Sequence, residues 1–142
     1  MAATPTSGST PTPGSTPSSK RRSIEIEGFK HSNPIPSASR IGPLLISSIV
    51  VGTDPATGAV PEAPEAQIAN LFTHVGRMLD AAGGDWSQVA RMTFYVDDIG
   101  HRALINGPWV ERFPDAESRP ARFTQVSGPP PARCEFIAYI ED

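Results

Sequence analysis

The stretch from Pro64 to Ala82 restricts the fold more than any other part of the chain, because its apolar residues recur with the period of an α-helix. These apolar residues are Ile68, Leu71, Phe72, Val75, Met78, Leu79 and Ala82. Pro64 suits the first turn of a helix, and Gly83-Gly84 ends the pattern. The sequence therefore predicts one amphipathic helix whose apolar stripe packs against another element.

Six other segments have the apolar patterns of β-strands. They are residues 23–28, 38–41, 44–51, 89–96, 121–126 and 134–140. Residues 44–51 are apolar on both faces, which predicts a central strand, and Gly42-Pro43 predicts a hairpin turn before it. A second helix over residues 99–113 is expected to kink at Gly107-Pro108, because proline removes a backbone donor.

The order of these elements predicts a single α+β domain over residues 23–142. Two helices can cover only one face of a mixed sheet of this size. The other face needs a second cover, and the apolar residues on both faces of residues 44–51 favour a second subunit in that place.

Residues 1–22 are expected to form a disordered tail. Residues 4–19 are only Pro, Ser, Thr and Gly, and Lys20, Arg21 and Arg22 follow them. No apolar run long enough for a secretory signal or a membrane span occurs in the chain. With a single cysteine, Cys134, this composition favours a soluble cytoplasmic protein, while organelle import or a weak nuclear signal remain minor alternatives for the tail.

The charge of the domain disfavours nucleic-acid partners. Residues 23–142 hold nine basic and fifteen acidic side chains, a net charge of −6, which repels phosphate backbones. His31, His74 and His101 have no spacing typical of metal ligands, and His74 is expected to lie off the buried face of the first helix. Cys134 beside Glu135 is expected to be an inert core thiol, so no metal, cofactor or activated nucleophile is predicted.

The segment Ser118-Arg119-Pro120-Ala121-Arg122 brings two cations to the beginning of a strand. Pro120 stiffens the backbone on which both guanidinium groups are carried. Such an arginine can bind a carboxylate through paired donors, although these residues alone favour two solvated arginines at a sheet edge, since charged residues are mostly exposed. Asp97-Asp98, just before the second helix, are expected to cap its first N–H groups.

From about residue 23 onward, the chain resembles the RidA/YjgF family of reactive-intermediate deaminases. The matching pieces, in order, include Asn33-Pro34-Ile35-Pro36, Ile41-Gly42, Asp54-Pro55-Ala56-Thr57-Gly58, Ala81-Ala82-Gly83, Ile105-Asn106, Phe113-Pro114 and Arg119-Pro120-Ala121-Arg122. The resemblance implies a chorismate-mutase-like α+β fold, with two helices on one face of a mixed sheet. It also implies a homotrimer with active sites in the clefts between subunits.

Family members hydrolyse 2-imino or 2-enamino acids to 2-keto acids and ammonia without a cofactor. By position, Arg122 matches the arginine that binds the substrate carboxylate, and Glu135 matches the acidic residue that positions water. Asn106 and Ser48 match supporting positions in the cleft. The implied partners are therefore a small carboxylate-bearing metabolite and two further copies of the chain.

Three departures from the family pattern concern the same cleft. Ile35 replaces an aromatic residue, and Ile49 replaces the glycine that follows the serine of the second strand. The loop between Val126 and Cys134 is short and rich in proline. Both isoleucines favour a larger or more apolar substrate. Two alternatives to imine hydrolysis stay open: a specialised-pathway hydrolase or tautomerase that uses this cleft, and a non-catalytic ligand-binding or regulatory trimer.

Overall fold

The computed structural model describes residues 20–141, so the expected disorder of residues 1–19 lies outside the described part of the chain. The elements are β1 (Arg22–Ile24), β2 (Ala38–Ile41), β3 (Leu44–Ser47), β4 (Val50–Val51), α1 (Pro64–Ala82), η2 (Trp86–Gln88), β5 (Val89–Val96), η3 (Ile99–Ile105), α2 (Asn106–Arg112), β6 (Ala121–Val126) and β7 (Arg133–Tyr139). No helix among the described residues is long and apolar enough to cross a membrane.

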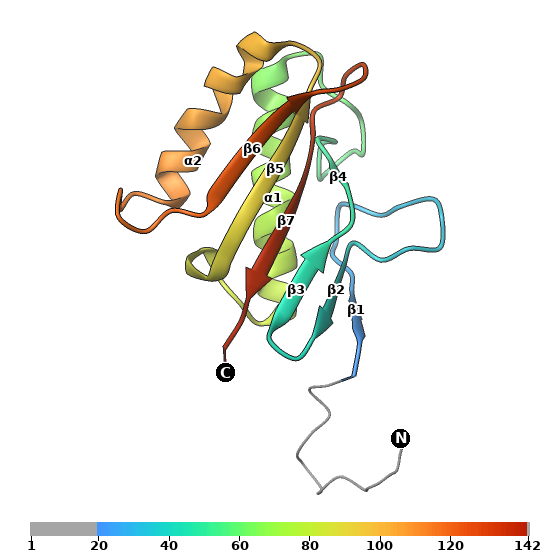
Figure 1. The fold of residues 1–142 in the computed structure, drawn as a ribbon. Helices are drawn as coiled ribbons and strands as arrows, with labels where there is room; N and C mark the ends of the chain where they lie inside the picture. Colours follow the sequence, from blue (N-terminus) through green and yellow to red (C-terminus); the bar gives the residue numbers. More distant parts are fainter. Residues whose placement is uncertain (1–19, 142) are drawn as a thin grey trace, which may run out of the picture.

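The strands form one mixed sheet in the order β1-β2-β3-β7-β5-β6, and β4 also pairs with β7. All pairs are antiparallel except β5 with β6, which are parallel. Parallel neighbours need a crossover connection, and η3 and α2 provide it. As Figure 1 shows, β7 lies inside the sheet, between β5 on one side and β3 and β4 on the other, so residues far apart in the sequence become neighbours there.

Both helices pack on the same face of this sheet, as the two-helix prediction required. The ring of Phe94 on β5 lies 5.7 Å from that of Phe72 on α1 and 6.4 Å from that of Trp109 on α2. Alternate residues of the central strands supply the rest of the core, with Met92 and Phe136 among those that are fully buried. The predicted helix is confirmed from Pro64 to Ala82. It ends where Gly83 adopts the left-handed conformation, at φ 85°.

The opposite face of the sheet is open and apolar. Its large hydrophobic side chains are between 37% and 55% exposed: Ile41, Leu44, Ile46, Phe123, Ile137 and Tyr139. Most of them adjoin by register, since Leu44 pairs with both Ile41 and Tyr139, and Ile46 pairs with Ile137. A soluble monomer rarely exposes such a continuous patch without a partner for it.

The prediction of one central strand over residues 44–51 is wrong, because the strand is interrupted. β3 ends at Ser47 and β4 begins at Val50, although both pair with β7. In the gap, the Ser48 backbone N–H donates to the Ser37 carbonyl at 2.9 Å, and the Ser48 hydroxyl donates to the Pro36 carbonyl at 2.8 Å. These bonds to an earlier loop replace the ladder bonds that a continuous strand would make. The first strand also ends earlier than residue 28, at Ile24.

The second helix is divided at Asn106 and does not kink at Gly107-Pro108. Its first part, η3, is a 3₁₀-helix, and α2 begins at Asn106. Pro108 is thus the third residue of α2, where the backbone N–H has no partner within the helix in any case. The proline therefore favours the start of a new helix at this point.

His74 is fully buried, which corrects the expectation that it lies off the buried face of α1. The loop after β4 lies directly on the helix here: a Cβ added to Gly52 would meet the Gln67 carbonyl oxygen at 2.5 Å. The Nε2 atom of His74 is 2.8 Å from the Thr53 carbonyl oxygen on that loop. The apolar pattern of the helix did not predict the burial of His74, because the loop after β4 covers this residue.

Candidate active site

Arg122 lies on β6 and points toward the side of the sheet that carries the helices. It pairs in register with Met92, whose side chain is fully buried in the core. The Arg122 Nη2 atom donates to the Arg102 carbonyl at 3.2 Å. The guanidinium carbon lies 5.2 Å from the centre of the Trp109 ring, within the range of a cation–π interaction. The surroundings therefore hold Arg122 in one orientation while part of it remains accessible.

The electrostatic surroundings of Arg122 suit an anion. Burial lowers the pKa of Arg122 below its ordinary value, and the charge of nearby Arg102 adds to this effect. A guanidinium keeps its proton at neutral pH even so. An anionic ligand would offset the repulsion between Arg122 and Arg102, so the surroundings of Arg122 favour a carboxylate.

Asn106 is carried by the helical segment that Arg122 contacts. It is exposed, it is the first residue of α2, and it lies between the two residues that Arg122 contacts, Arg102 and Trp109. Arg119 differs from Arg122, because its Nε atom donates to the Phe113 carbonyl at 2.8 Å and so ties down the loop before β6. Of the two arginines around Pro120, Arg122 is thus the one placed beside a second candidate ligand group.

Glu135 lies on β7 and faces the open side of the sheet. The hydroxyl of Tyr95 on β5 donates a short hydrogen bond to the Glu135 Oε1 atom. The two residues line a hollow of about 280 Å³, together with Arg91, Phe123 and Gln125. This hollow therefore combines a carboxylate, a phenol and an arginine on the sheet face that also carries the exposed hydrophobic side chains.

Ser48 and Ile49 lie beside Glu135 in the sheet. β3 ends its pairing with β7 at Ile137, and β4 begins its pairing at Cys134, so the Ser48-Ile49 gap falls alongside Glu135 and Phe136. Ile35 belongs to the loop that the Ser48 hydroxyl contacts through Pro36. Both Ile35 and Ile49 are exposed. Hence four of the six candidate residues, Ile35, Ser48, Ile49 and Glu135, come from one region.

Within one chain the structure does not bring Arg122 and Glu135 together. Residues that pair in register share a face of the sheet: Arg122 pairs with buried Met92, while Glu135 pairs with the next residue, Thr93. The two side chains thus leave the sheet on opposite sides. We call Arg122 with Asn106 the arginine half-site, and Glu135 with Ser48, Ile49 and Ile35 the glutamate half-site.

Sequence reasoning missed two contributors to these half-sites, Trp109 and Tyr95. Trp109 on α2 is buried in the core, and its ring also supports the Arg122 guanidinium. Tyr95 on β5 donates to Glu135. Tertiary contacts alone reveal these roles: Tyr95 meets Glu135 through the pairing of β5 with β7, forty residues apart in the chain, and Trp109 meets Arg122 where α2 packs beside β6.

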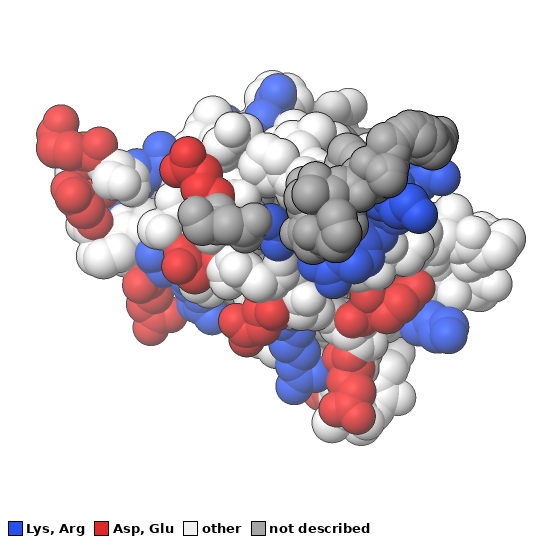
Figure 2. All heavy atoms as spheres, turned by 90° about the horizontal axis from the view of Figure 1, so that it is seen from below, with Lys and Arg blue, Asp and Glu red and all other residues white. Residues whose placement is uncertain are grey.

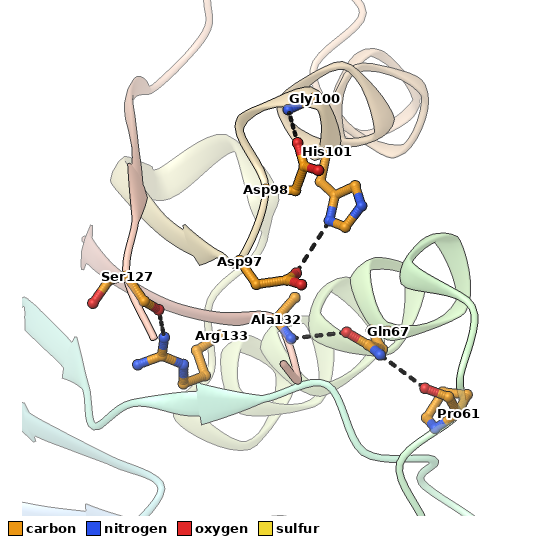
Figure 3. Close-up of polar contacts among 9 residues, drawn as sticks. All are labelled: Pro61, Gln67, Asp97, Asp98, Gly100, His101, Ser127, Ala132 and Arg133. Carbon is orange, nitrogen blue, oxygen red and sulfur yellow. Dashed lines mark hydrogen bonds and ion pairs between the residues drawn. The ribbon is translucent and has the colours of Figure 1, made fainter. Parts of the chain in front are cut away.

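The polar contacts drawn in Figure 3 are structural. Gln67 joins two loops, because its Nε2 atom donates to the Pro61 carbonyl at 2.8 Å and its Oε1 atom accepts from the Ala132 N–H at 2.9 Å. Asp98 accepts from the Gly100 N–H at 2.7 Å, which confirms its capping role. Asp97 instead lies 3.3 Å from the Nδ1 atom of His101.

The surface chemistry gives no sign of a metal centre in the described part of the chain. Among residues 20–141, no three His, Cys, Asp or Glu side chains are close enough to hold a metal ion. Cys134 is fully buried, and burial raises the pKa of its thiol far above the ordinary value, with the charge of Glu135 adding to this.

Figure 2 shows acidic and basic side chains interspersed on the end of the molecule that it displays.

Comparisons with known proteins point to one family. The family model described as Endoribonuclease L-PSP matches residues 28–132. Reactive Intermediate Deaminase A, chloroplastic, of Arabidopsis thaliana is 32% identical over 99 residues, which cover 68% of this chain and 52% of that protein. The 2-iminobutanoate/2-iminopropanoate deaminase of Salmonella typhimurium is 30% identical over 83 residues, which cover 58% of this chain and 65% of that protein.

A solved structure extends the likeness to most of the fold. The crystal structure of the YjgF gene product from E. coli matches with a TM-score of 0.74 at 24% identity, and the match covers 83% of this chain and 98% of that one. The α+β fold expected from the sequence is therefore confirmed. The chain belongs to the RidA/YjgF family, whose family model carries the description Endoribonuclease L-PSP.

Proposed function

We propose that this protein is a hydrolytic deaminase, which converts a reactive 2-imino or 2-enamino acid to the 2-keto acid and ammonia in a cleft between subunits of a homotrimer. One observation carries the proposal: Arg122 and Glu135 leave the sheet on opposite sides, so a single chain does not bring the two candidate residues together. Rotational symmetry lets the arginine half-site of one protomer face the glutamate half-site of the next. Each cleft then contains both.

The arginine half-site suits the constant part of such a substrate, its carboxylate. Arg122 is oriented by the Arg102 carbonyl and the Trp109 ring, which leaves further guanidinium N–H groups to pair with a carboxylate. Asn106 offers an amide on the same surface to the imine nitrogen or to a carboxylate oxygen. Fixing the carboxylate in this way holds the electrophilic carbon in one place.

The glutamate half-site suits the water that reacts. Glu135 accepts the proton of a water molecule as the water oxygen bonds to C2 of the iminium, and this forms a tetrahedral carbinolamine. Glu135 returns this proton to the nitrogen, and the C2–N bond then breaks to release ammonia. The hydroxyl on C2 gives its proton to the leaving ammonia, and the C2 oxygen becomes the keto group. The overall reaction consumes one water and involves no oxidation or reduction.

The apolar open face supports self-association. Six large hydrophobic side chains there are exposed in the single chain, and a partner of the same sequence offers an equally apolar surface to cover them. A homotrimer predicts a solution mass three times the 15.1 kDa of one chain, measured by light scattering after size exclusion. The mass of a single chain would contradict the shared cleft.

Ile35 and Ile49 support a substrate with an apolar side chain. Both are exposed and lie next to Ser48, at the part of the glutamate half-site where a side chain of the substrate would extend. The ribonuclease named in the family description receives less support, because a net charge of −6 on residues 23–142 repels RNA. Imines of larger apolar amino acids are therefore the first substrates to compare with 2-iminobutyrate.

The test is deamination of 2-iminobutyrate generated in the assay, followed as the loss of imine against its spontaneous hydrolysis. Arg122→Ala is expected to reduce kcat/KM at least about thirty-fold, because loss of a charge-assisted contact to the substrate costs about 2–5 kcal/mol. Arg119→Ala is the matched control and should keep most of the activity, since the Arg119 side chain donates to the carbonyls of Phe113 and Pro114 in the loop before β6. Full activity of Arg122→Ala would contradict the role of Arg122. A wild-type protein with no effect on any 2-imino acid would contradict the function.

A further inference from the structure

We propose that Tyr95 is the positioning residue for Glu135: its hydroxyl occupies one carboxylate oxygen and so leaves the other to bind the reacting water. This inference rests on the proposed function and deepens it, because it assigns a partner to the residue that orients water. It starts from the hydrogen bond between the Tyr95 hydroxyl and the Glu135 Oε1 atom.

The pairing of β5 with β7 brings the two side chains into reach. Thr93 is directly opposite Glu135, and Tyr95 is opposite Arg133, so Tyr95 is a diagonal neighbour of Glu135 on the same face. Long side chains reach such diagonal neighbours across an antiparallel pair. A phenol is long enough to do so, and a phenylalanine at this position would lack the donor.

The ring of Tyr95 is itself held in place from the other side. The guanidinium carbon of Arg133 lies 5.4 Å from the ring centre, and the Arg133 Nη2 atom donates to the Ser127 carbonyl. Tyr95 is thus fixed between a cation on its face and a carboxylate at its hydroxyl. A glutamate alone can rotate about its side-chain bonds, whereas a donor fixed in this way selects one orientation of the carboxylate.

The chemistry requires Tyr95 to remain a donor. The hydrogen bond to Glu135 raises the pKa of Tyr95 above its ordinary value, and burial adds to the effect. The charged groups that face the phenol are Glu135, Arg133 and Arg91, while β6 contributes Phe123 and Gln125, which do not titrate. Since an ionised carboxylate only accepts, the hydroxyl must donate, and the second carboxylate oxygen stays available for water.

The first test compares Tyr95→Phe with Tyr139→Phe in the imine assay. Tyr139, the other tyrosine of the chain, lies on the same sheet face and is the matched control. Tyr95→Phe should lower kcat about ten-fold or more, with KM changed less than about two-fold, because the lost hydroxyl positions Glu135 and does not hold the substrate. Tyr139→Phe should retain the wild-type kcat.

The second test does not depend on activity. In the Tyr139→Phe background, Tyr95 is the only tyrosine left, and the ultraviolet absorbance of tyrosinate reports its ionisation. The further change Glu135→Gln should lower the pKa of Tyr95, because it removes the negative charge that holds the phenolic proton. Circular dichroism over the same pH range shows that the titrated protein is folded.

The outcomes separate the two proposals. If the wild-type protein hydrolyses the imine and Tyr95→Phe has the same kcat, the positioning role is overturned and the proposed function stands. An unchanged Tyr95 titration in Glu135→Gln would overturn the contact itself. Absence of wild-type turnover would overturn the proposed function, and the titration would then still decide whether Tyr95 holds Glu135.

Discussion

Gln67 is the polar residue whose removal should destabilise the fold most sharply. Although it lies on α1, it is only 5% exposed, and its amide bonds to both the loop before α1 and the loop before β7. Gln67→Met keeps the length of the side chain and the helix propensity but removes both hydrogen bonds. The substitution therefore isolates the polar contribution at a buried position.

The size of the effect follows from the two groups that lose a partner. The N–H of Ala132 becomes a buried donor with no acceptor, which costs about 1–3 kcal/mol, and Ala132 is only 5% exposed. The carbonyl of Pro61 is partly accessible and can bond to water, so its loss adds about 0.5–1 kcal/mol. We therefore expect the free energy of unfolding to fall by about 2–4 kcal/mol and Tm by about 10 °C.

Urea unfolding followed by circular dichroism measures this change, at one fixed protein concentration, because subunit association also affects stability. Ala69→Met is the matched control: it places the same residue on the exposed side of α1, and its effect should lie within about 0.5 kcal/mol. A loss below about 0.5 kcal/mol for Gln67→Met would refute the reasoning, since it would mean that the two loops do not depend on this amide.

Two further predictions concern buried groups that titrate. Burial lowers the pKa of His74 below 6.5, so the unfolded chain binds the proton more readily than the folded chain. The free energy of unfolding should therefore have its full value above about pH 6.5 and decrease as the pH falls below it. His74→Gln should flatten that dependence in urea unfolding between about pH 5 and 7, and an unchanged slope would contradict the assignment. Cys134, fully buried with its thiol pKa raised, should react with iodoacetamide only as the protein unfolds, and rapid labelling of the native protein, measured by mass spectrometry, would exclude this placement.

Local patterns were enough to predict several elements at their observed positions. The helix from Pro64 to Ala82, the strand from Val89 to Val96 and the hairpin turn at Gly42-Pro43 are confirmed. Each depends on features within a few residues, such as helical period, alternation and turn chemistry. Two of the errors occurred where another segment decided the outcome: bonds from Ser48 to an earlier loop interrupted the predicted central strand, and the loop after β4 buried His74.

The candidate site shows the same division. The sequence by itself determined which residues are candidates for the chemistry, because Arg122, Glu135, Asn106 and Ser48 match family positions in order along the chain. Only the tertiary structure decided that Arg122 and Glu135 leave the sheet on opposite sides, and that Tyr95 donates to Glu135. The physical reason is that side chains alternate along a strand, so strand register sets the direction of each one. Register depends on contacts between segments far apart in the sequence, and no local pattern contains it.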